Sequence, residues 1–158
     1  MCGSPKRFWR IGVLYFDTSA LVKQYFAEAG SVTVRKLLRS EEVVFTAILT
    51  YAEAHAAFAR RKREGILSAQ ATRKLALRFD KDWETYEVVV ISEEILALTR
   101  KMLYRHPLRS ADAIHLATAL ALGQRVPGGA WGFVCADHKL GAAVTMEGVR
   151  VIDVTTAP

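Results

Sequence analysis

Short apolar runs alternate with longer helix-forming segments along this chain, and that alternation limits the folds open to it. Parallel strands need a helix-length connection, and strands covered on both faces read as unbroken apolar runs. The expected strands are residues 11–16, 43–45, 86–91, 131–136 and 149–154. We therefore predict an α/β fold in which helices cover both faces of a parallel sheet.

The segments between these runs carry helix start and stop signals. Gly30 and Gly65 follow two of them, and Ser68, Ser92 and Ser110 stand at expected N-cap positions. The expected helices are residues 18–28, 31–39, 46–64, 68–84, 92–104 and 110–122, with a short helix after Asp137.

The composition bounds the class of protein. A chain of 158 residues, 51% hydrophobic and 24% charged, is typical of one globular domain. No window approaches the roughly 18 uncharged apolar residues of a membrane span, and the run at 11–16 is too short for a signal-peptide core. We expect a cytoplasmic protein without a membrane segment.

Cys2 and Cys135 have no partners at zinc-finger spacing and make no disulfide framework.

The chain is basic, with 22 Lys and Arg against 16 Asp and Glu and a net charge of +6. This excess suits a polyanionic partner such as nucleic acid. The basic run at residues 60–63, taken alone, is more simply the solvated end of a helix than a binding patch.

Two acids directly follow apolar runs, Asp17 in LYFD and Asp137 in FVCAD. Ligands of an open parallel sheet gather beyond the carboxyl ends of its strands, so acids there are candidate site residues. Either could also be an ordinary helix N-cap.

Two further acids lie inside expected helices. Glu53 shares its helix face with small and apolar residues and has no Lys or Arg three or four positions away, so it either meets a cation or donor or points to solvent. Asp112 lies in the first turn of its helix, where the helix dipole alone would favour an acid. His115, one turn further on, is interpreted as a packed or carboxylate-bonded core histidine rather than a ligand.

The four acids come from separate elements that an α/β fold can direct into one crevice. Two carboxylates about 4 Å apart repel by around 4 kcal/mol at an effective dielectric near 20, so such a cluster takes up protons or binds a hard divalent ion. Oxygen ligands favour Mg²⁺ or Mn²⁺ over zinc.

Four segments resemble, in order, the blocks of PIN-domain nucleases. They are LYFDTSALVKQYF, the acid in TAILTYAEAHAAFARR, LRSADAIHLATAL, and FVCADHKLGAAVTMEGVRVIDV. The resemblance implies a five-stranded parallel sheet in the order 3-2-1-4-5. It also implies that Asp17, Glu53, Asp112 and Asp137 are the catalytic acids, with Asp17 and Asp112 as direct metal ligands.

The resemblance further implies metal-dependent hydrolysis of RNA phosphodiester bonds, with Glu53 and Asp137 binding a second ion, orienting water or supporting the ligands. The hydroxyls of Thr18 and Ser19 would orient Asp17, although helix capping explains them equally. A lone compact PIN domain is similar to VapC-type toxins, which form homodimers and are held inactive by a small antitoxin protein.

Two alternatives stay open. A Mg²⁺-dependent phosphohydrolase of the haloacid-dehalogenase type would need a second Asp where Ser19 stands, and a receiver domain would need an acidic pair near the first strand. A catalytically silent PIN-like domain that binds RNA or a protein partner would not need all four acids.

We expect residues 1–158 to form a single PIN domain, with its core at about 13–154 and residues 1–12 as an N-terminal extension. Deleting residues 1–12 is therefore expected to leave the melting temperature and the activity nearly unchanged, because the core pattern begins at the first strand. Thermal unfolding of the full and shortened chains tests this. A large loss of stability would show that Phe8, Trp9 or Ile11 packs into the domain or a dimer interface.

Overall fold

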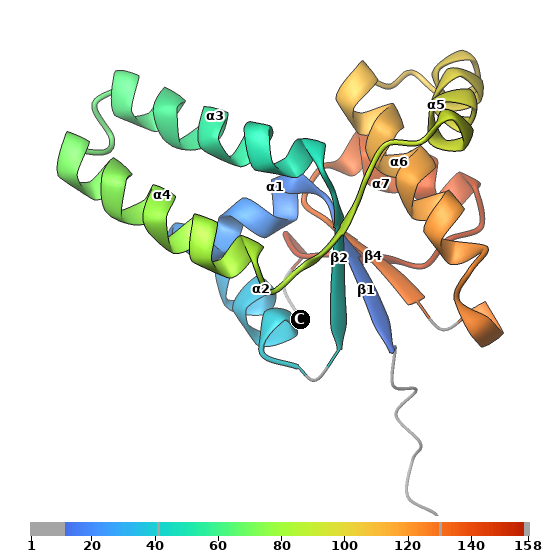
Figure 1. Cartoon of the computed structure of the whole chain (residues 1–158), viewed down its shortest axis with the longest axis horizontal. Helices are drawn as coiled ribbons and strands as arrows, with labels where there is room; N and C mark the ends of the chain where they lie inside the picture. Colours follow the sequence, from blue (N-terminus) through green and yellow to red (C-terminus); the bar gives the residue numbers. More distant parts are fainter. Residues whose placement is uncertain (1–11, 41, 130, 157–158) are drawn as a thin grey trace, which may run out of the picture.

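The computed structural model describes residues 12–40, 42–129 and 131–156, and its centre is one parallel sheet (Figure 1). The strand order is β3-β2-β1-β4-β5, which confirms the predicted α/β class and strand order. The strands are β1 Val13–Phe16, β2 Val43–Ala47, β3 Glu87–Val89, β4 Trp131–Cys135 and β5 Val151–Asp153. Most of the expected N-terminal extension, residues 1–11, lies outside the described residues. The carbonyl of Gly12 already accepts a hydrogen bond from Val43 N at 3.4 Å.

Helices connect the strands and cover both faces of the sheet. They are α1 Thr18–Leu21, the 3-10 turn η1 Val22–Tyr25, α2 Ser31–Leu38, α3 Leu49–Arg63, α4 Ala69–Trp83, α5 Glu93–Arg105, α6 Ser110–Gly123, the 3-10 turn η2 Pro127–Gly129 and α7 His138–Met146. The α3–α4 hairpin, α1 and α2 lie on one side of the sheet, and α5, α6 and α7 lie on the other (Figure 1).

Several expected boundaries were wrong, and the contacts in the structure give a physical reason for three of them. The helix expected over residues 18–28 is shorter, because α1 ends at Leu21 and the 3-10 turn η1 ends at Tyr25. The next residue, Phe26, has an extended backbone, and its carbonyl accepts from Ser31 Oγ and Arg35 instead of from a following turn. Thr46 belongs to β2, not to the next helix, because it pairs with Val88 and its hydroxyl donates to Phe16 O. Ser110 is the first residue of α6 rather than its cap, and Arg109 holds the cap position without a side-chain bond.

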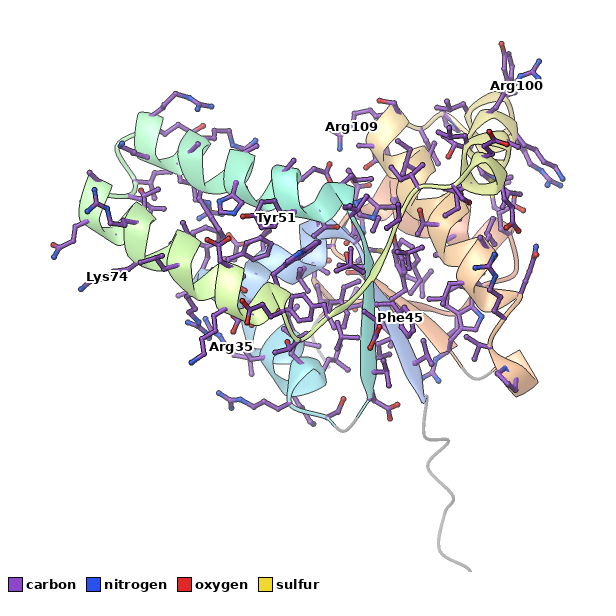
Figure 2. All side chains as sticks on the ribbon, viewed as in Figure 1. Arg35, Phe45, Tyr51, Lys74, Arg100 and Arg109 are labelled. Carbon is purple, nitrogen blue, oxygen red and sulfur yellow. The ribbon has the colours of Figure 1, made fainter. Side chains whose placement is uncertain are left out.

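Alternation along β1 divides the core between the two faces of the sheet. Leu14 and Phe16 pack with Phe58 and Phe79 beneath the α3–α4 hairpin. Tyr15 packs on the opposite face, in a cluster that includes residues of α6, α7 and β4. Figure 2 shows how densely side chains fill the space on both sides of the sheet. The central strand therefore anchors both layers, and the residue that follows it has a fixed position.

Within the part of the chain that the structure describes, no helix is long and apolar enough to cross a membrane. Cys135 is a buried strand thiol, and burial raises its pKa to about 12. Cys2 lies outside the described residues.

Gly30 precedes α2 at a point where the chain touches the end of the sheet. Its φ is +89°, and a Cβ built there would lie 2.5 Å from the carbonyl oxygen of Val154. Gly65 has a similar φ of +73° but nothing within 4 Å of its Cβ position.

Gly30→Ala should therefore destabilise the protein more than Gly65→Ala does. Both substitutions incur the left-handed backbone penalty of about 1–2 kcal/mol, but only Gly30→Ala adds a clash with backbone that has no side chain to move aside. Chemical denaturation of the two variants measures the difference. Equal losses would show that the contact with Val154 relaxes without cost.

Candidate functional site

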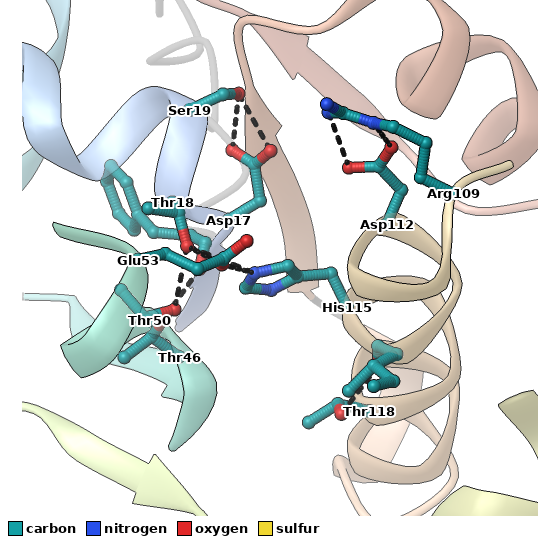
Figure 3. Close-up of polar contacts among 12 residues, drawn as sticks. Asp17, Thr18, Ser19, Thr46, Thr50, Glu53, Arg109, Asp112, His115 and Thr118 are labelled. Carbon is teal, nitrogen blue, oxygen red and sulfur yellow. Dashed lines mark hydrogen bonds and ion pairs between the residues drawn. The ribbon is translucent and has the colours of Figure 1, made fainter. Parts of the chain in front are cut away.

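A pocket of about 410 Å³ opens at the carboxyl edge of the sheet and is lined by all four predicted acids. Asp17 follows β1, Asp137 follows β4, Glu53 comes from α3, and Asp112 comes from the first turn of α6. Figure 3 shows Asp17, Glu53 and Asp112 around this space. The structure thus brings together acids from distant parts of the chain. The first and the last of them, Asp17 and Asp137, are 120 positions apart in the sequence.

Asp17 is the most buried of the four, with 3% of its surface exposed. Ser19 Oγ donates to its carboxylate at 2.7 and 2.9 Å, and Ala20 N donates at 3.0 Å. The same Ser19 hydroxyl accepts from Ala136 N at 3.0 Å, which ties the ends of β1 and β4 together. Burial, with a smaller contribution from the nearby carboxylate of Asp137, raises the pKa of Asp17 to about 6 against the effects of His115, Ser19 and Ala20.

Asp112 and Asp137 keep local partners as well as lining the pocket. Asp137 caps α7 by accepting from Leu140 N at 2.9 Å, so the helix-cap interpretation is also correct for it. Asp112 is paired with Arg109, whose Nε lies 3.0 Å from Oδ2. Arg109 is itself largely exposed, and its guanidinium borders the pocket beside Asp112 (Figure 3).

Glu53 is held by a network that reaches into the core. Thr18 Oγ1 donates to Glu53 Oε2, and His115 Nε2 lies 3.0 Å from the same oxygen. Because an ionised carboxylate only accepts, Nε2 carries a hydrogen and donates it. On its other side, His115 Nδ1 lies 2.9 Å from the hydroxyl of buried Tyr15. His115 is thus a carboxylate-bonded core histidine, as predicted.

This network affects the ionisation of Glu53. Partial burial alone would raise the pKa of Glu53, but the hydrogen bonds from His115 and Thr18 outweigh burial and hold the pKa below its ordinary value. Both bonds fall on Oε2, so Oε1 is the oxygen available to a water molecule or an ion. Thr18 therefore orients Glu53, not Asp17 as the sequence suggested, while Ser19 does orient Asp17.

Three arginines that were not predicted as site residues line the same pocket, Arg60, Arg63 and Arg109. The spacing of Arg109 and Asp112, three positions apart at a helix start, could have indicated their ion pair. Arg60 and Arg63 belong to a basic run that is evident in the sequence, but the sequence does not show which of its side chains face the pocket.

The donor set fits a hard divalent cation, because all four acids offer oxygen ligands in one cavity. Burial also disfavours the charged form of Asp17, and a bound cation would stabilise that form. Among residues 12–40, 42–129 and 131–156, however, no three His, Cys, Asp or Glu side chains are already gathered closely enough to hold an ion. Asp112 would have to exchange its Arg109 partner for the cation.

The fold and the pocket together define an α/β protein with an acidic, cation-suited site at the carboxyl edge of a parallel sheet. The PIN domain family matches residues 14–126. Ribonuclease VapC45 of Mycobacterium tuberculosis (strain CDC 1551 / Oshkosh) is 32% identical over 145 residues, which cover 88% of this chain and 94% of that protein.

Two solved structures share the architecture. FitAcB from Neisseria gonorrhoeae has a TM-score of 0.67 at 15% identity, with 92% of this chain and 100% of that chain covered. A toxin-antitoxin complex from Klebsiella pneumoniae has a TM-score of 0.61 at 17% identity, with 89% and 97% covered. This chain belongs to the PIN-domain family.

The raised pKa of Asp17 makes a prediction about metal-free stability. Because the carboxyl binds a proton more tightly in the folded than in the unfolded state, the wild type should lose stability as the pH rises from about 4 to about 6. Asp17→Asn removes this loss. In EDTA at pH 7 the variant should therefore be more stable, by up to about 3 kcal/mol, and the gain should vanish near pH 4.

Thermal scans of both proteins across this pH range provide the measurement. If the two stability profiles run parallel from pH 4 to pH 7, Asp17 does not ionise with the raised pKa that its burial implies.

Proposed function

We propose that this chain is a divalent-metal-dependent endoribonuclease, a single PIN domain with its core at about 13–154, which acts as the toxin of a VapBC-type toxin-antitoxin pair. The observation that carries the proposal is the convergence of four acids from four separate elements on one pocket that arginines also line. The relative named Ribonuclease VapC45 supports the activity.

In the proposed reaction, Asp17 and Asp112 would hold Mg²⁺ or Mn²⁺, which when bound would activate a water molecule and stabilise charge on the phosphoryl oxygens. Glu53 is kept ionised by His115 and Thr18, which both bond to Oε2. Its other oxygen, Oε1, would accept a hydrogen bond from the attacking water. In the strand order of the sheet, β1 lies between β2, which precedes the helix of Glu53, and β4, which precedes Asp137. Asp137 would serve the same ion or a second one.

Arg109 has a role that depends on what Asp112 does. When Asp112 turns to the ion, the guanidinium of Arg109 loses its carboxylate partner and becomes available to a phosphate oxygen of the substrate. The ion pair thus keeps both side chains neutralised until cation and substrate arrive.

The proposed partners follow from the toxin assignment. A small antitoxin would bind the chain and block the pocket, and two copies of the chain would form a homodimer. RNA and an antitoxin as partners favour action in the cytoplasm. Similarity to the Klebsiella pneumoniae toxin-antitoxin complex supports the antitoxin partner.

The purified chain, freed of antitoxin, should cleave single-stranded or looped RNA with Mg²⁺ or Mn²⁺ and not in EDTA. Asp17→Asn and Asp112→Asn should each lower the cleavage rate on the order of 100-fold or more, because each removes a charged ligand. Asp80→Asn is the matched control, since Asp80 lies on α4 and bonds to Tyr51 and His55 away from the pocket.

Gel analysis of a labelled RNA over time gives the rates. Cleavage that persists in EDTA would rule out the metal mechanism. RNA binding without cleavage under any divalent ion would favour the silent-domain alternative.

A further inference from the structure

The end of α3 carries four consecutive basic residues, and the structure separates them by the surface that each one contacts. Arg60 and Arg63 line the acidic pocket. Arg61 turns the other way, where its guanidinium carbon lies 3.6 Å from the centre of the Phe26 ring and Nη2 lies 2.8 Å from Glu28. Lys62 is exposed and does not line the pocket. The run is therefore not a uniform solvated end.

We propose that Arg60 and Arg63 form a phosphate-binding subsite that holds the RNA strand beyond the bond to be cleaved. This inference rests on the proposed ribonuclease function, and it names the part of the pocket that binds the substrate backbone.

The face of α3 has the layout that such a subsite needs. Glu53 and Arg60 are seven residues apart, nearly two helical turns, so they lie on the same face at about 10 Å along the axis. Ala56 and Ala57 lie between them and also line the pocket. Their small side chains leave room for a strand to pass along the helix from the acids to the arginines.

Charge gives a second reason. Four carboxylates against three guanidinium groups leave one net negative charge on the pocket lining when all are ionised. Without Arg60 and Arg63 the lining would carry three net negative charges and would repel a polyanion much more strongly. Arginine suits this role because its planar fork donates two parallel hydrogen bonds to a phosphate.

Both arginines are available to a ligand. The only ion pair of Arg60 among the described residues is with Glu64 at 3.9 Å, and both side chains are at least half exposed, so the pair is worth little. Within the same described ranges, Arg63 makes no ion pair. A surface whose cations are already neutralised, as at Arg61, could not bind phosphate in this way.

The test compares the full-length double variant Arg60→Gln/Arg63→Gln with Lys62→Gln, which changes charge on the same helical turn but outside the pocket. Binding of a fluorescein-labelled single-stranded RNA is measured by anisotropy in EDTA over a range of KCl concentrations. The double variant should reduce the salt slope of log K by about 1.4, at about 0.7 per phosphate contact. At fixed salt it should bind about tenfold more weakly or worse.

Lys62→Gln should leave the salt slope nearly unchanged. Mn²⁺ should still raise the melting temperature of all three proteins, because all four acids are intact. With Mn²⁺ present, the double variant should lose cleavage mainly through a higher KM.

Each other outcome has a distinct meaning. An unchanged slope in the double variant of an enzyme that cleaves RNA would overturn the subsite and leave the proposed function standing. An equal effect of Lys62→Gln would show nonspecific attraction and also overturn it. Loss of antitoxin binding without loss of RNA binding would assign the arginines to a protein partner instead. The expected slope change in a protein that never cleaves RNA would support the subsite and reject the ribonuclease. A wild type that binds no RNA would reject both.

Discussion

Electrostatic repulsion among four carboxylates in one partly buried pocket determines how the carboxyl edge of this sheet is built. Asp17 is 3% exposed, and its raised pKa shows that the protein alone does not fully compensate its charge. Each of the four acids has its own local partner: Ser19 and Ala20 for Asp17, His115 and Thr18 for Glu53, Arg109 for Asp112, and the Leu140 amide for Asp137. These partners allow the acids to share a cavity before any cation is present.

The central strand makes this arrangement possible. Leu14 and Phe16 pack into one core layer and Tyr15 into the other, so the position of Asp17 is fixed from both sides. Tyr15 also reaches His115, and His115 reaches Glu53, so the packing of β1 influences an acid on α3 through a histidine on α6. The core and the pocket are therefore one connected structure.

Local patterns predicted much of the fold, because apolar runs and glycine or serine boundaries are properties of neighbouring residues. They also identified Asp17 and Asp137, which follow strands directly. The convergence of Glu53 and Asp112 with them depends on long-range packing. The fold class made this convergence possible, and the family resemblance implied it. Thr18 was assigned to the wrong acid because its nearest neighbour in sequence is Asp17, whereas its hydroxyl faces α3. The run at residues 60–63 could not be divided from sequence, since the division depends on where Phe26 and Glu28 lie.

The pairing of β1 with β4 has a consequence for the timing of synthesis. Val13 lies beside Trp131 and Phe16 beside Val134, so the middle of the sheet joins the first strand to one made more than a hundred residues later. Until β4 emerges from the ribosome, β1 lacks one neighbour and Asp137 cannot take its place beside Asp17. Such non-local pairing is slow to form. A nascent chain therefore has no complete pocket until β4 and the residues that follow it have been made and have paired with β1.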